Sequence, residues 1–449
     1  MPALLDKIIE RPRDKHHEAR RHATAYKVLA VVSLLALVLQ TSMLMLSLFE
    51  QPLPYNIFDP GGEPLESPEF SRVLTSITGG GYYSHNRVDV LTNGDKFYPA
   101  ELEAIRGARQ FIFIECYIIQ KGRVADQLLA ALEERARAGV RVRMVVDAIG
   151  ATAFPDSRFD RLRAAGGSAA WYHLVRWYSW PRANNRTHRE LVVVDGKVAF
   201  VGGAGFADQW LYSTAKNPQW RDTMIRIEGE AAGGLAATFS ENWLESAGEM
   251  LISPKYYSVF NGGGQTNALV VTSSPTSGRS SEARELFQSI IAKATRSIHL
   301  TNPYFMPDKS LRMEMVRAVR ERKVEVTILV PGKRNDHLLS RRSSRLLYGD
   351  LLRAGARIFE YQPSMIHAKI MIVDGVWAVV GSSNLDSRSF GLNDEVNAAM
   401  PDPAVAARLE QDFQNDLQQS RRITYDEWRH RPPWQKLEEL VGWLLINQE

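Results

Sequence analysis

The sequence feature that most constrains the fold of this chain is an internal repeat. The stretch THRELVVVDG, which contains His188 and Asp195, has a second version, IHAKIMIVDG, which contains His367 and Asp374. The two histidines are as far apart in the sequence as the two aspartates, and each copy continues through an apolar stretch into glycine. A repeat of this length predicts two similar halves. Such halves commonly pack about a pseudo-two-fold axis, where residues of both can share one site.

Strand and helix patterns alternate in both halves of the repeat. In the first half we expect strands at Val88–Leu91, Phe111–Ile119 and Val140–Val146, and helices at Pro99–Arg109 and Val124–Ala138. In the second half we expect strands at Leu269–Val271, Ile298–Leu300 and Val324–Val330, and a helix at Ser281–Ala294. This order predicts an α/β fold of two duplicated lobes, in which helices cover a mixed sheet.

The chain has 449 residues, which is long for a single core and suggests several parts. The glycine-rich stretch at Asn261–Gly264 divides the two halves. The predicted order is a basic cytoplasmic N-terminus (1–27), a transmembrane helix (28–49), a linker (50–86), a first lobe (87–260), a second lobe (265–420) and an amphipathic C-terminal tail (421–449).

The stretch from Val28 to Phe49 carries no charged residue. As a helix it is long enough to cross a bilayer core of roughly 30 Å. A buried core helix and a cleaved signal peptide are the alternatives, but the stretch is long and no small-residue cleavage site follows it. Lysines and arginines precede the span, and none follows before Arg72. The positive-inside rule then predicts a single-pass protein of the cell (inner) membrane, with a cytoplasmic N-terminus and the folded body on the outer (periplasmic) face.

Charge and cysteine content narrow the partners only slightly. The formal net charge of +4 permits attraction to an anionic surface but does not distinguish nucleic acid from acidic lipid. The single cysteine, Cys116, excludes a multi-thiolate metal site. We expect no cofactor and no metal, and the oligomeric state stays open.

The second copy of the repeat carries the strongest chemical signal. On an extended strand His367 and Lys369 point to the same side, toward one pocket. An imidazole can attack phosphorus or protonate a leaving alkoxide, while an ammonium, a hydroxyl and an amide stabilise the non-bridging oxygens. We therefore expect Lys369, Ser382 and Asn384 to bind substrate. Asp374 falls on the other face and suits a structural role better than contact with phosphate.

These residues resemble a known motif. His367, Lys369, Asp374 and Asn384, with Asn393 and Glu395 downstream, look like the HKD motif of the phospholipase D superfamily. The surrounding sequence, HAKIMIVDG to VVGSSNLDSRSFGLNDEVN, is similar in particular to bacterial cardiolipin synthases, as are Ile114–Ile119 and the Trp-Arg-Asp ending at Asp222. The resemblance covers roughly residues 87 to 430.

The resemblance implies two lobes whose HKD copies meet in one cleft. It places the catalytic groups at His188, His367, Lys369, Asp195 and Asp374. One histidine would carry the phosphatidyl group and the other would act as general acid and then base, with their assignment open. Asp222 and Glu395, each downstream of its own copy, are the candidates to orient a histidine and fix its tautomer.

The implied activity is that of a cardiolipin synthase. Such an enzyme takes a phosphatidyl group from phosphatidylglycerol or a similar donor, releases an alcohol and passes the group to a second lipid alcohol. The expected partners are therefore phospholipids and a membrane, without nucleic acid. Two alternatives stay open: a phosphodiesterase of the same fold that hydrolyses phospholipid or nucleic acid, and a catalytically silent membrane scaffold.

The first copy departs from the motif at two positions. Glu190 stands where the motif has lysine, and Gly205 stands where an asparagine would parallel Asn384. An anion close to a phosphodiester costs up to about 4 kcal/mol at an effective dielectric constant near 20. Either nearby arginines compensate, or Glu190 is protonated, or it pairs with a base such as Lys369. The arginines near in sequence are Arg182, Arg186 and Arg189.

Two further segments bear on lipid contact. A basic stretch contains Arg341, Arg342 and Arg345, and it fits either a solvated helix face or a surface for acidic head groups. The tail from Trp428 onward combines tryptophans with an amphipathic apolar pattern. We expect the tail to contact a membrane interface rather than to dock on the body.

Overall fold

The computed structural model describes residues 11–49, 55–59, 62–174, 184–214, 217–257, 260–275 and 281–446. The chain divides into two compact units, Met1–Pro54 and Tyr55–Glu449. The first unit contains helix α2 (Arg11–Phe49), in which His22–Ser42 is long and apolar enough to cross a membrane. All the side chains described in that stretch are exposed, as expected of a membrane span and not of a core helix. The predicted apolar N-terminal helix is thus confirmed.

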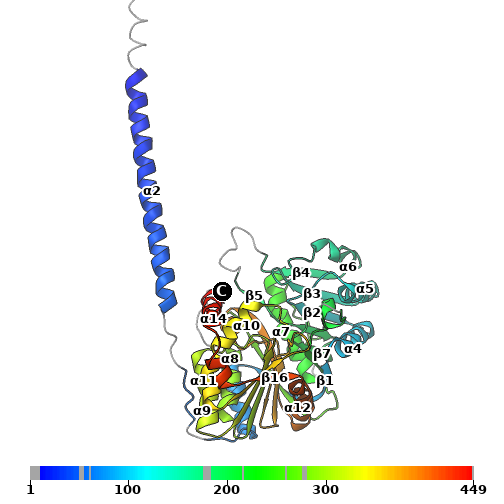
Figure 1. Cartoon of the computed structure of the whole chain (residues 1–449). Helices are drawn as coiled ribbons and strands as arrows, with labels where there is room; N and C mark the ends of the chain where they lie inside the picture. The colour runs from blue at the N-terminus through cyan, green and yellow to red at the C-terminus, as the bar shows by residue number, and fades with distance from the viewer. Residues whose placement is uncertain are drawn as a thin grey trace, which may run out of the picture. The chain divides into compact units, whose positions relative to one another are not determined.

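The second unit is built on one mixed sheet with sixteen described strands (Figure 1). Its first half contains β1 (Gly81–Thr92), β2 (Phe111–Cys116), β3 (Arg141–Asp147), β4 (Ser168–Tyr172), β6 (Leu191–Val194), β7 (Val198–Gly202) and β8 (Thr223–Glu228). Its second half contains β9 (Thr266–Ser273), β10 (Ser297–Thr301), β11 (Glu325–Pro331), β12 (Arg357–Tyr361), β13 (Ile370–Val373), β14 (Trp377–Gly381) and β15 (Asn393–Pro401). The short strand β5 (Arg186–Thr187) pairs with β15, and β16 (Ser420–Ile423) pairs with β12 at the edge.

The strand order shows the duplication directly. Outward from the centre the first half runs β1-β8-β7-β6-β2-β3-β4, and the second half runs β9-β15-β14-β13-β10-β11-β12. The two central strands, β1 and β9, pair antiparallel. In each half three successive strands, β2-β3-β4 and β10-β11-β12, are parallel to one another, and the strands between them and the centre are antiparallel. The predicted α/β fold of two duplicated lobes, with helices covering a mixed sheet, is confirmed, while the exact lobe boundaries stay a prediction.

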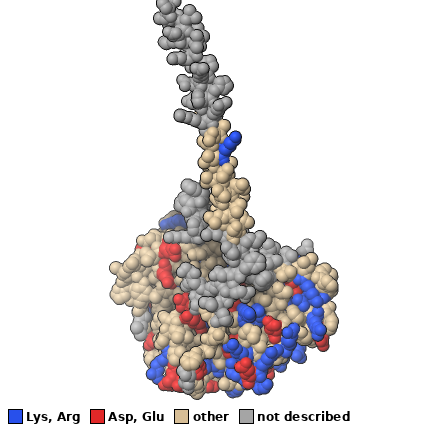
Figure 2. All heavy atoms as spheres, turned by 90° about the vertical axis from the view of Figure 1, so that its left-hand side faces the viewer, with Lys and Arg blue, Asp and Glu red and all other residues tan. Residues whose placement is uncertain are grey.

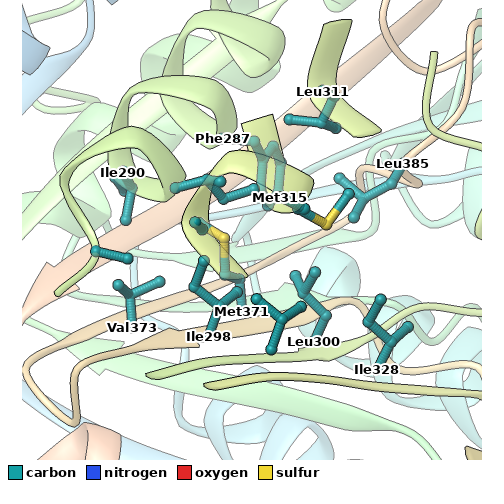
Figure 3. Packing of buried hydrophobic residues seen from close by; sticks show 14 of the residues in the cluster. Phe287, Ile290, Ile298, Leu300, Leu311, Met315, Ile328, Met371, Val373 and Leu385 are labelled. Carbon is teal, nitrogen blue, oxygen red and sulfur yellow. The ribbon is translucent and has the colours of Figure 1, made fainter. Parts of the chain in front are cut away.

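Helices cover both faces of this sheet. Helices α7 (Glu230–Ala247) and α12 (Pro403–Gln418) pack on the central core, which draws strand residues from both halves. On the other face, α4 (Gly94–Gly107) and α5 (Arg123–Arg137) cover the first half. The second half is covered there by α8 (Glu282–Lys293), α9 (Lys309–Arg320) and α11 (Tyr348–Ala354), whose cluster is seen in Figure 3.

Alternation along β2 explains how one strand serves two layers. Phe111 and Phe113 belong to the central core, whereas Ile112 and Ile114 belong to the cluster under α4 and α5. Successive side chains of a strand point to opposite faces, so a strand covered on both faces is apolar at most of its positions. All six residues of β2 are buried, including Glu115. The continuous apolar run predicted for this strand therefore reflects helices on both sides.

The folded body begins earlier than the sequence analysis predicted. The linker expected at 50–86 contains helix α3 (Pro68–Thr78) and the first residues of β1. Ser67 caps α3 by accepting from the N–H of Phe70 at 3.0 Å, and Pro68 occupies the first turn, where no N–H partner is needed. Phe70 and Leu74 then pack into the core of the second half.

The C-terminal tail docks on the body through its described residues, contrary to the sequence expectation, while its contact with a membrane stays a prediction. Helices α13 (Tyr425–Arg429) and α14 (Pro433–Ile446) follow β16, and α14 packs on α10 (Leu338–Leu346). The indole of Trp428 donates to the carbonyl of Arg345 at 2.6 Å. Exposed apolar side chains nevertheless remain on α14, at Trp434, Leu437 and Leu440.

The basic stretch on α10 is largely neutralised within the fold. Arg341 and Arg345 both pair with the buried carboxylate of Glu360, and Arg342 pairs with Glu438. The face of the molecule in Figure 2 likewise shows basic and acidic side chains mixed together.

Candidate active site

Both motif histidines lie where the two halves of the sheet meet. His188 follows β5 and precedes β6, and its N–H donates to the carbonyl of Asp394 at 2.9 Å. His367 precedes β13, and its N–H donates to the carbonyl of Arg221 at 2.7 Å. Each histidine is therefore tied by its backbone to the opposite half. The structure therefore places both histidines at the junction of the two halves, as the repeat predicts.

His367 is held by a buried carboxylate. Its Nδ1 lies 2.9 Å from Oδ2 of Asp222, and Asp222 also accepts from the indole of Trp210 at 2.9 Å and from the N–H of Thr223 at 2.8 Å. A carboxylate only accepts hydrogen bonds, so the proton sits on Nδ1 and Nε2 keeps its lone pair. The rings of Trp210, Trp220 and Tyr304 surround the imidazole at centroid distances of 5.6, 5.6 and 6.1 Å.

The ammonium of Lys369 lies beside the same imidazole. Its Nζ is 2.8 Å from Nδ1 and 3.1 Å from Nε2 of His367, and it donates to the carbonyl of His367 at 2.8 Å. Burial and the charge of Lys369 lower the pKa of His367, against the opposing effect of Asp222. Burial also lowers the pKa of Lys369. A neutral imidazole with a cation beside it suits attack on, or proton exchange with, an anionic phosphodiester.

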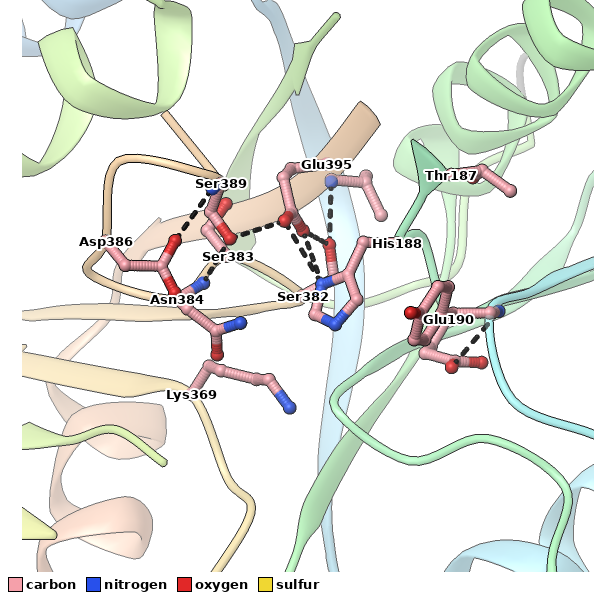
Figure 4. Close-up of polar contacts among 12 residues, drawn as sticks. Thr187, His188, Glu190, Lys369, Ser382, Ser383, Asn384, Asp386, Ser389 and Glu395 are labelled. Carbon is pink, nitrogen blue, oxygen red and sulfur yellow. Dashed lines mark hydrogen bonds and ion pairs between the residues drawn. The ribbon is translucent and has the colours of Figure 1, made fainter. Parts of the chain in front are cut away.

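His188 has a parallel arrangement (Figure 4). Its Nδ1 lies 3.1 Å from the carboxylate of Glu395, which is fully buried. Glu395 also accepts from the hydroxyls of Ser382 and Ser389, the latter at 2.7 Å. Burial raises the pKa of Glu395, but its contacts with His188 and the two serines outweigh this and hold the pKa below its ordinary value. Glu395 therefore stays ionised and fixes the proton of His188 on Nδ1.

The two orienting carboxylates are exchanged between the halves. The sequence analysis named Asp222 and Glu395 as candidates to orient a histidine, and the structure shows which histidine each one contacts. Asp222 of the first half holds His367, and Glu395 of the second half holds His188. The physical reason is the sheet topology. The backbone at Arg221 pairs with Ile366, and β15 pairs with β5, so each carboxylate lies next to the motif of the other half.

The three residues expected to bind substrate divide into two groups. Ser382 donates to Glu395 and accepts from the N–H of Val396 at 3.0 Å, so it positions the carboxylate and is not free for phosphate. Lys369 and Asn384 lie next to each other in Figure 4. The side-chain oxygen of Asn384 is buried and has no hydrogen-bond partner within the described chain. A phosphate oxygen needs a donor, so the groups that can bind it are the ammonium of Lys369 and the amide nitrogen of Asn384, not the Asn384 oxygen.

Asp195 and Asp374 lie away from the histidines, at the far ends of β6 and β13. Both have a left-handed backbone conformation with φ of 55°. The carboxylate of Asp195 accepts from the N–H groups of Arg109, Gln110 and Phe111 at 2.8–2.9 Å. Asp374 does the same for Thr295, Arg296 and Ser297 at 2.8 Å. The catalytic placement implied by the motif is therefore corrected: these aspartates tie the turn to the entry of β2 or β10.

Glu190 takes the place of the missing lysine and is buried. Its Oε1 accepts from the N–H groups of Tyr117 and Ile118 at 3.2 and 3.3 Å. Its Oε2 is buried and has no hydrogen-bond partner among the residues described. Burial raises the pKa of Glu190 well above its ordinary value, against the opposing effects of these backbone contacts and of the charge of Lys369. Of the three possibilities raised by the sequence, the structure favours protonation.

The arginines considered as a source of positive charge beside Glu190 bind other groups. Arg189 donates to the carbonyl of Thr238 at 2.9 Å and to Glu241 at 2.8 Å, both on α7. Arg186 lies 3.6 Å from Asp147 and donates to the carbonyl of His173. Arg182 lies outside the described residues. The first copy thus receives no cation from the two described arginines.

The two departures of the first copy form one structural feature. A Cβ atom on Gly205 would lie 3.0 Å from Oε1 of Glu190 and 2.4 Å from the carbonyl oxygen of Ile118. No side chain fits at position 205 while the backbone at Ile118 stays in place. The carboxyl group of Glu190 therefore lies against the glycine and uses the backbone N–H groups that border it.

Sequence reasoning missed several residues that support the site. Trp210 fixes Asp222, and Ser389 fixes Glu395. Tyr98 donates to the carbonyl of Gly205 and holds that loop. The only sequence signal for Ser389 is that it is a polar residue shortly after the motif, and this signal is weak. Trp210 and Tyr98 carry no local signal, because their partners are distant in sequence.

Comparison with known proteins agrees with this geometry. The family model described as cardiolipin synthase, PLD-like domain, matches residues 102–243 and 287–417. The major cardiolipin synthase of Bacillus subtilis is 34% identical over 363 residues, which are 80% of this chain and 75% of that protein. The cardiolipin synthase of Geobacillus kaustophilus is 34% identical over 359 residues, 79% of this chain and 71% of that protein.

Solved structures share the fold at much lower identity. The phosphatidylserine synthase of Haemophilus influenzae matches with a TM-score of 0.62 at 16% identity, over 85% of this chain and 98% of that one. The polyphosphate kinase of Porphyromonas gingivalis matches with a TM-score of 0.53 at 13% identity, over 76% and 49%. These two likenesses show the fold alone. The family match and the relatives at 34% identity show that the chain belongs to the phospholipase D-like family of cardiolipin synthases.

Proposed function

We propose that this protein is a phosphatidyltransferase that moves a phosphatidyl group from one phospholipid to the alcohol of another through a phosphohistidine intermediate. The observation that carries the proposal is the pair of buried imidazoles, each held at Nδ1 by a carboxylate of the opposite half. This leaves both Nε2 atoms for chemistry at the junction of the halves. The relatives named as cardiolipin synthases support a lipid alcohol as the acceptor.

The reaction needs two proton-balanced steps. In the first, Nε2 of one histidine attacks phosphorus and the bond to the leaving alcohol breaks. The other histidine enters this step protonated on both nitrogens, gives its Nε2 proton to the leaving oxygen and becomes neutral. In the second, the acceptor alcohol gives its proton to that histidine and attacks phosphorus, and the bond from phosphorus to nitrogen breaks. Lys369 and Asn384 stabilise the non-bridging oxygens in both steps.

Glu190 is compatible with this chemistry in its neutral form, which its raised pKa favours. An ionised carboxylate would repel the phosphodiester, whereas a carboxylic acid can donate its O–H to a non-bridging oxygen. Oε2, the oxygen without a partner in the described structure, is the atom left to make that bond. The first half thus offers a neutral donor where the motif has a cation.

The apolar helix α2 and membership of this family indicate association with a membrane. We infer that the N-terminus is cytoplasmic and that the catalytic body faces the periplasm. The support is the charge distribution: many lysines and arginines precede the span, and none follows it before Arg72. Trp434, Leu437 and Leu440, exposed on α14, offer a further apolar contact for an interface.

The test is a product analysis with purified full-length protein in phosphatidylglycerol vesicles. We expect a tetra-acyl product together with free glycerol, detected by lipid mass spectrometry. Phosphatidic acid as the main product would instead indicate a hydrolase, and unchanged lipid would indicate a scaffold. His188→Ala and His367→Ala should both abolish turnover, while His85→Ala, which changes an exposed histidine far from the motif, should leave it intact.

A further inference from the structure

The described part of helix α14 turns its charged side toward the body. The carboxylate of Glu439 is buried and forms an ion pair at 2.6 Å with Arg431, which is buried as well. Glu439 also lies 3.7 Å from Arg345 of α10. Glu438, its neighbour, pairs with Arg342 of α10 at 3.2 Å. Ion pairs therefore lie on the side of α14 that packs on the body.

The other side of α14 is apolar and exposed. Trp434, Leu437 and Leu440 are 58%, 62% and 43% exposed. Residues three or four apart lie on one face of a helix, so these three form a row, and Lys436 lies beside Leu440 along it. The apolar stripe of a surface helix ordinarily faces the core. Helix α14 has the reverse arrangement, so its apolar row indicates a partner outside the described fold.

A basic hollow borders this row. It has a volume of about 540 Å³ and lies open to solvent between α11, α13 and α14. Four of its six lining residues are lysine or arginine and none is acidic, so the hollow attracts an anion. The lining residues are Arg353, Tyr425, Trp428, Arg429, Arg431 and Lys436.

Three of the four cations in the hollow are available to a ligand. Arg431 is neutralised by Glu439, and its guanidinium lies 4.1 Å from the centroid of the Trp428 ring. Arg353 donates from Nε to the neutral hydroxyl of Tyr425 at 3.1 Å. Arg353, Arg429 and Lys436 form no ion pair with any residue that the structure describes. Their charges are therefore left for a partner.

We propose that the apolar row of α14 and the basic hollow form a docking surface for an anionic membrane, with lipid phosphates in the hollow and the row among the upper parts of the acyl chains. This contact lies outside the reaction and goes beyond the phosphatidyl transfer proposed above. Phosphates and acyl chains adjoin at a bilayer surface, which matches cations beside an apolar row. Tryptophan, here Trp434, is favoured at the same depth.

Charge and the rest of the chain favour a membrane over a second copy of the protein. A symmetric pair that docked through this face would bring identical patches together, so the unpaired cations of one copy would meet those of the other. The chain also contains the apolar helix α2, which is long enough to cross a membrane. The occupant with the matching charge is therefore a lipid surface.

The experiment follows a fluorescent label on α14 of the full-length protein in nanodiscs. The label is attached to Leu437→Cys, since Cys116, the single native cysteine, is buried. The discs contain phosphatidylcholine alone or with phosphatidylglycerol, and spin-labelled lipid quenches a fluorophore that enters the acyl region. We expect strong quenching with phosphatidylglycerol and weak quenching without it. The same label on Glu134→Cys, exposed on α5, should be quenched equally little in both discs.

Charge reversal tests the hollow itself. Arg429→Glu and Lys436→Glu should each lower the ratio of inserted to free label about fivefold or more in discs with phosphatidylglycerol, with little change in discs without it. Both side chains are exposed, so the fold should persist, which thermal unfolding checks. Arg431 is left unchanged because it holds Glu439. Lys309→Glu, which reverses an exposed lysine on α9, is the matched control.

Three results would overturn the proposal. Equal quenching in both kinds of disc, or quenching that the charge reversals do not change, would show that the hollow does not bind lipid phosphate. Disulfide-linked dimers of unlabelled Leu437→Cys, with no quenching of the labelled protein, would show that a second copy covers α14. No quenching and no dimers would show that α14 stays in water. The measurement needs no turnover, so His367→Ala should give the same quenching, and a failure of the proposed transfer would leave this result unchanged.

Discussion

Nδ1 of His367 lies 2.9 Å from the carboxylate of Asp222, although the two residues belong to different halves of the duplicated sheet. The reverse pair, His188 and Glu395, crosses the junction in the other direction at 3.1 Å. Each half therefore supplies one histidine and the carboxylate that orients the other. A single half contains no complete acid-base pair, so catalysis depends on the docking of both halves.

We expect Asp222→Asn and Glu395→Gln to lower kcat by about 10³-fold or more, because an amide can donate to Nδ1 and stabilise the wrong tautomer. The effect of each should resemble that of losing the histidine in the opposite half. Turnover of phosphatidylglycerol at saturating substrate is the measurement. Asp89→Asn, at an exposed carboxylate on β1, should behave as wild type. Variants with unchanged kcat would show that orientation across the junction is not used.

Much of this architecture could be predicted from the sequence, and the reason is periodicity. The repeated motif predicts two lobes, and the alternation of apolar residues predicts β3 and β11 close to their observed positions. Identities within the motif also indicate which side chains carry the chemistry. These signals are local, since they depend only on neighbours along the chain.

The errors have a common physical origin in contacts that are distant in sequence. Spacing alone cannot tell which half supplies the carboxylate for His367, because both candidates lie downstream of a histidine. The role of Asp374 depends on the N–H groups of Thr295 to Ser297, which only the fold brings near. The tail contains the same apolar residues whether it meets lipid or protein. Its docking is decided by partners such as Arg345.

Glu190 should tolerate a neutral replacement and not a cation. Glu190→Gln keeps an oxygen for the N–H groups of Tyr117 and Ile118 and a donor for substrate, so we expect kcat within about threefold of wild type. Glu190→Lys removes the acceptor for those N–H groups and buries a charge, and we expect a loss of activity of tenfold or more, with stability reduced by about 1–3 kcal/mol. Kinetics and urea unfolding measure the two effects. A faster Glu190→Lys enzyme would mean that the first copy is merely a weakened motif.

The protonation of Glu190 also predicts how stability depends on pH. Its pKa in the folded protein is raised well above the ordinary value of 4.5, chiefly by burial, so between these two values the folded state holds a proton that the unfolded state has released. The contribution of Glu190 to the free energy of unfolding is therefore fully present below pH 4.5, and it is lost as pH rises through the pKa of the folded protein. The slope reaches about 1.4 kcal/mol per pH unit.

We expect urea unfolding between pH 5 and pH 8 to show this slope as a difference between wild-type protein and Glu190→Gln. The glutamine cannot ionise, so its free energy of unfolding should fall less as pH rises. Other titrating groups contribute equally to both proteins and cancel in the comparison. Parallel curves for the two proteins would mean that Glu190 is ionised in the folded state, and the neutral donor assigned to it would then be withdrawn.

The aspartates of the motif should affect folding and not chemistry. Asp374→Ala leaves the N–H groups of Thr295, Arg296 and Ser297 without their acceptor, and we expect it to lower the free energy of unfolding by roughly 2–4 kcal/mol. Asp374→Asn keeps one acceptor oxygen and should lose about half as much. Because the carboxylate lies at the opposite end of β13 from His367, kcat of the folded fraction should stay within about twofold of wild type at low temperature. Asp195→Ala should behave in the same way at the entry of β2. A large loss of kcat in either variant, with the melting temperature unchanged, would instead give these aspartates a part in the reaction.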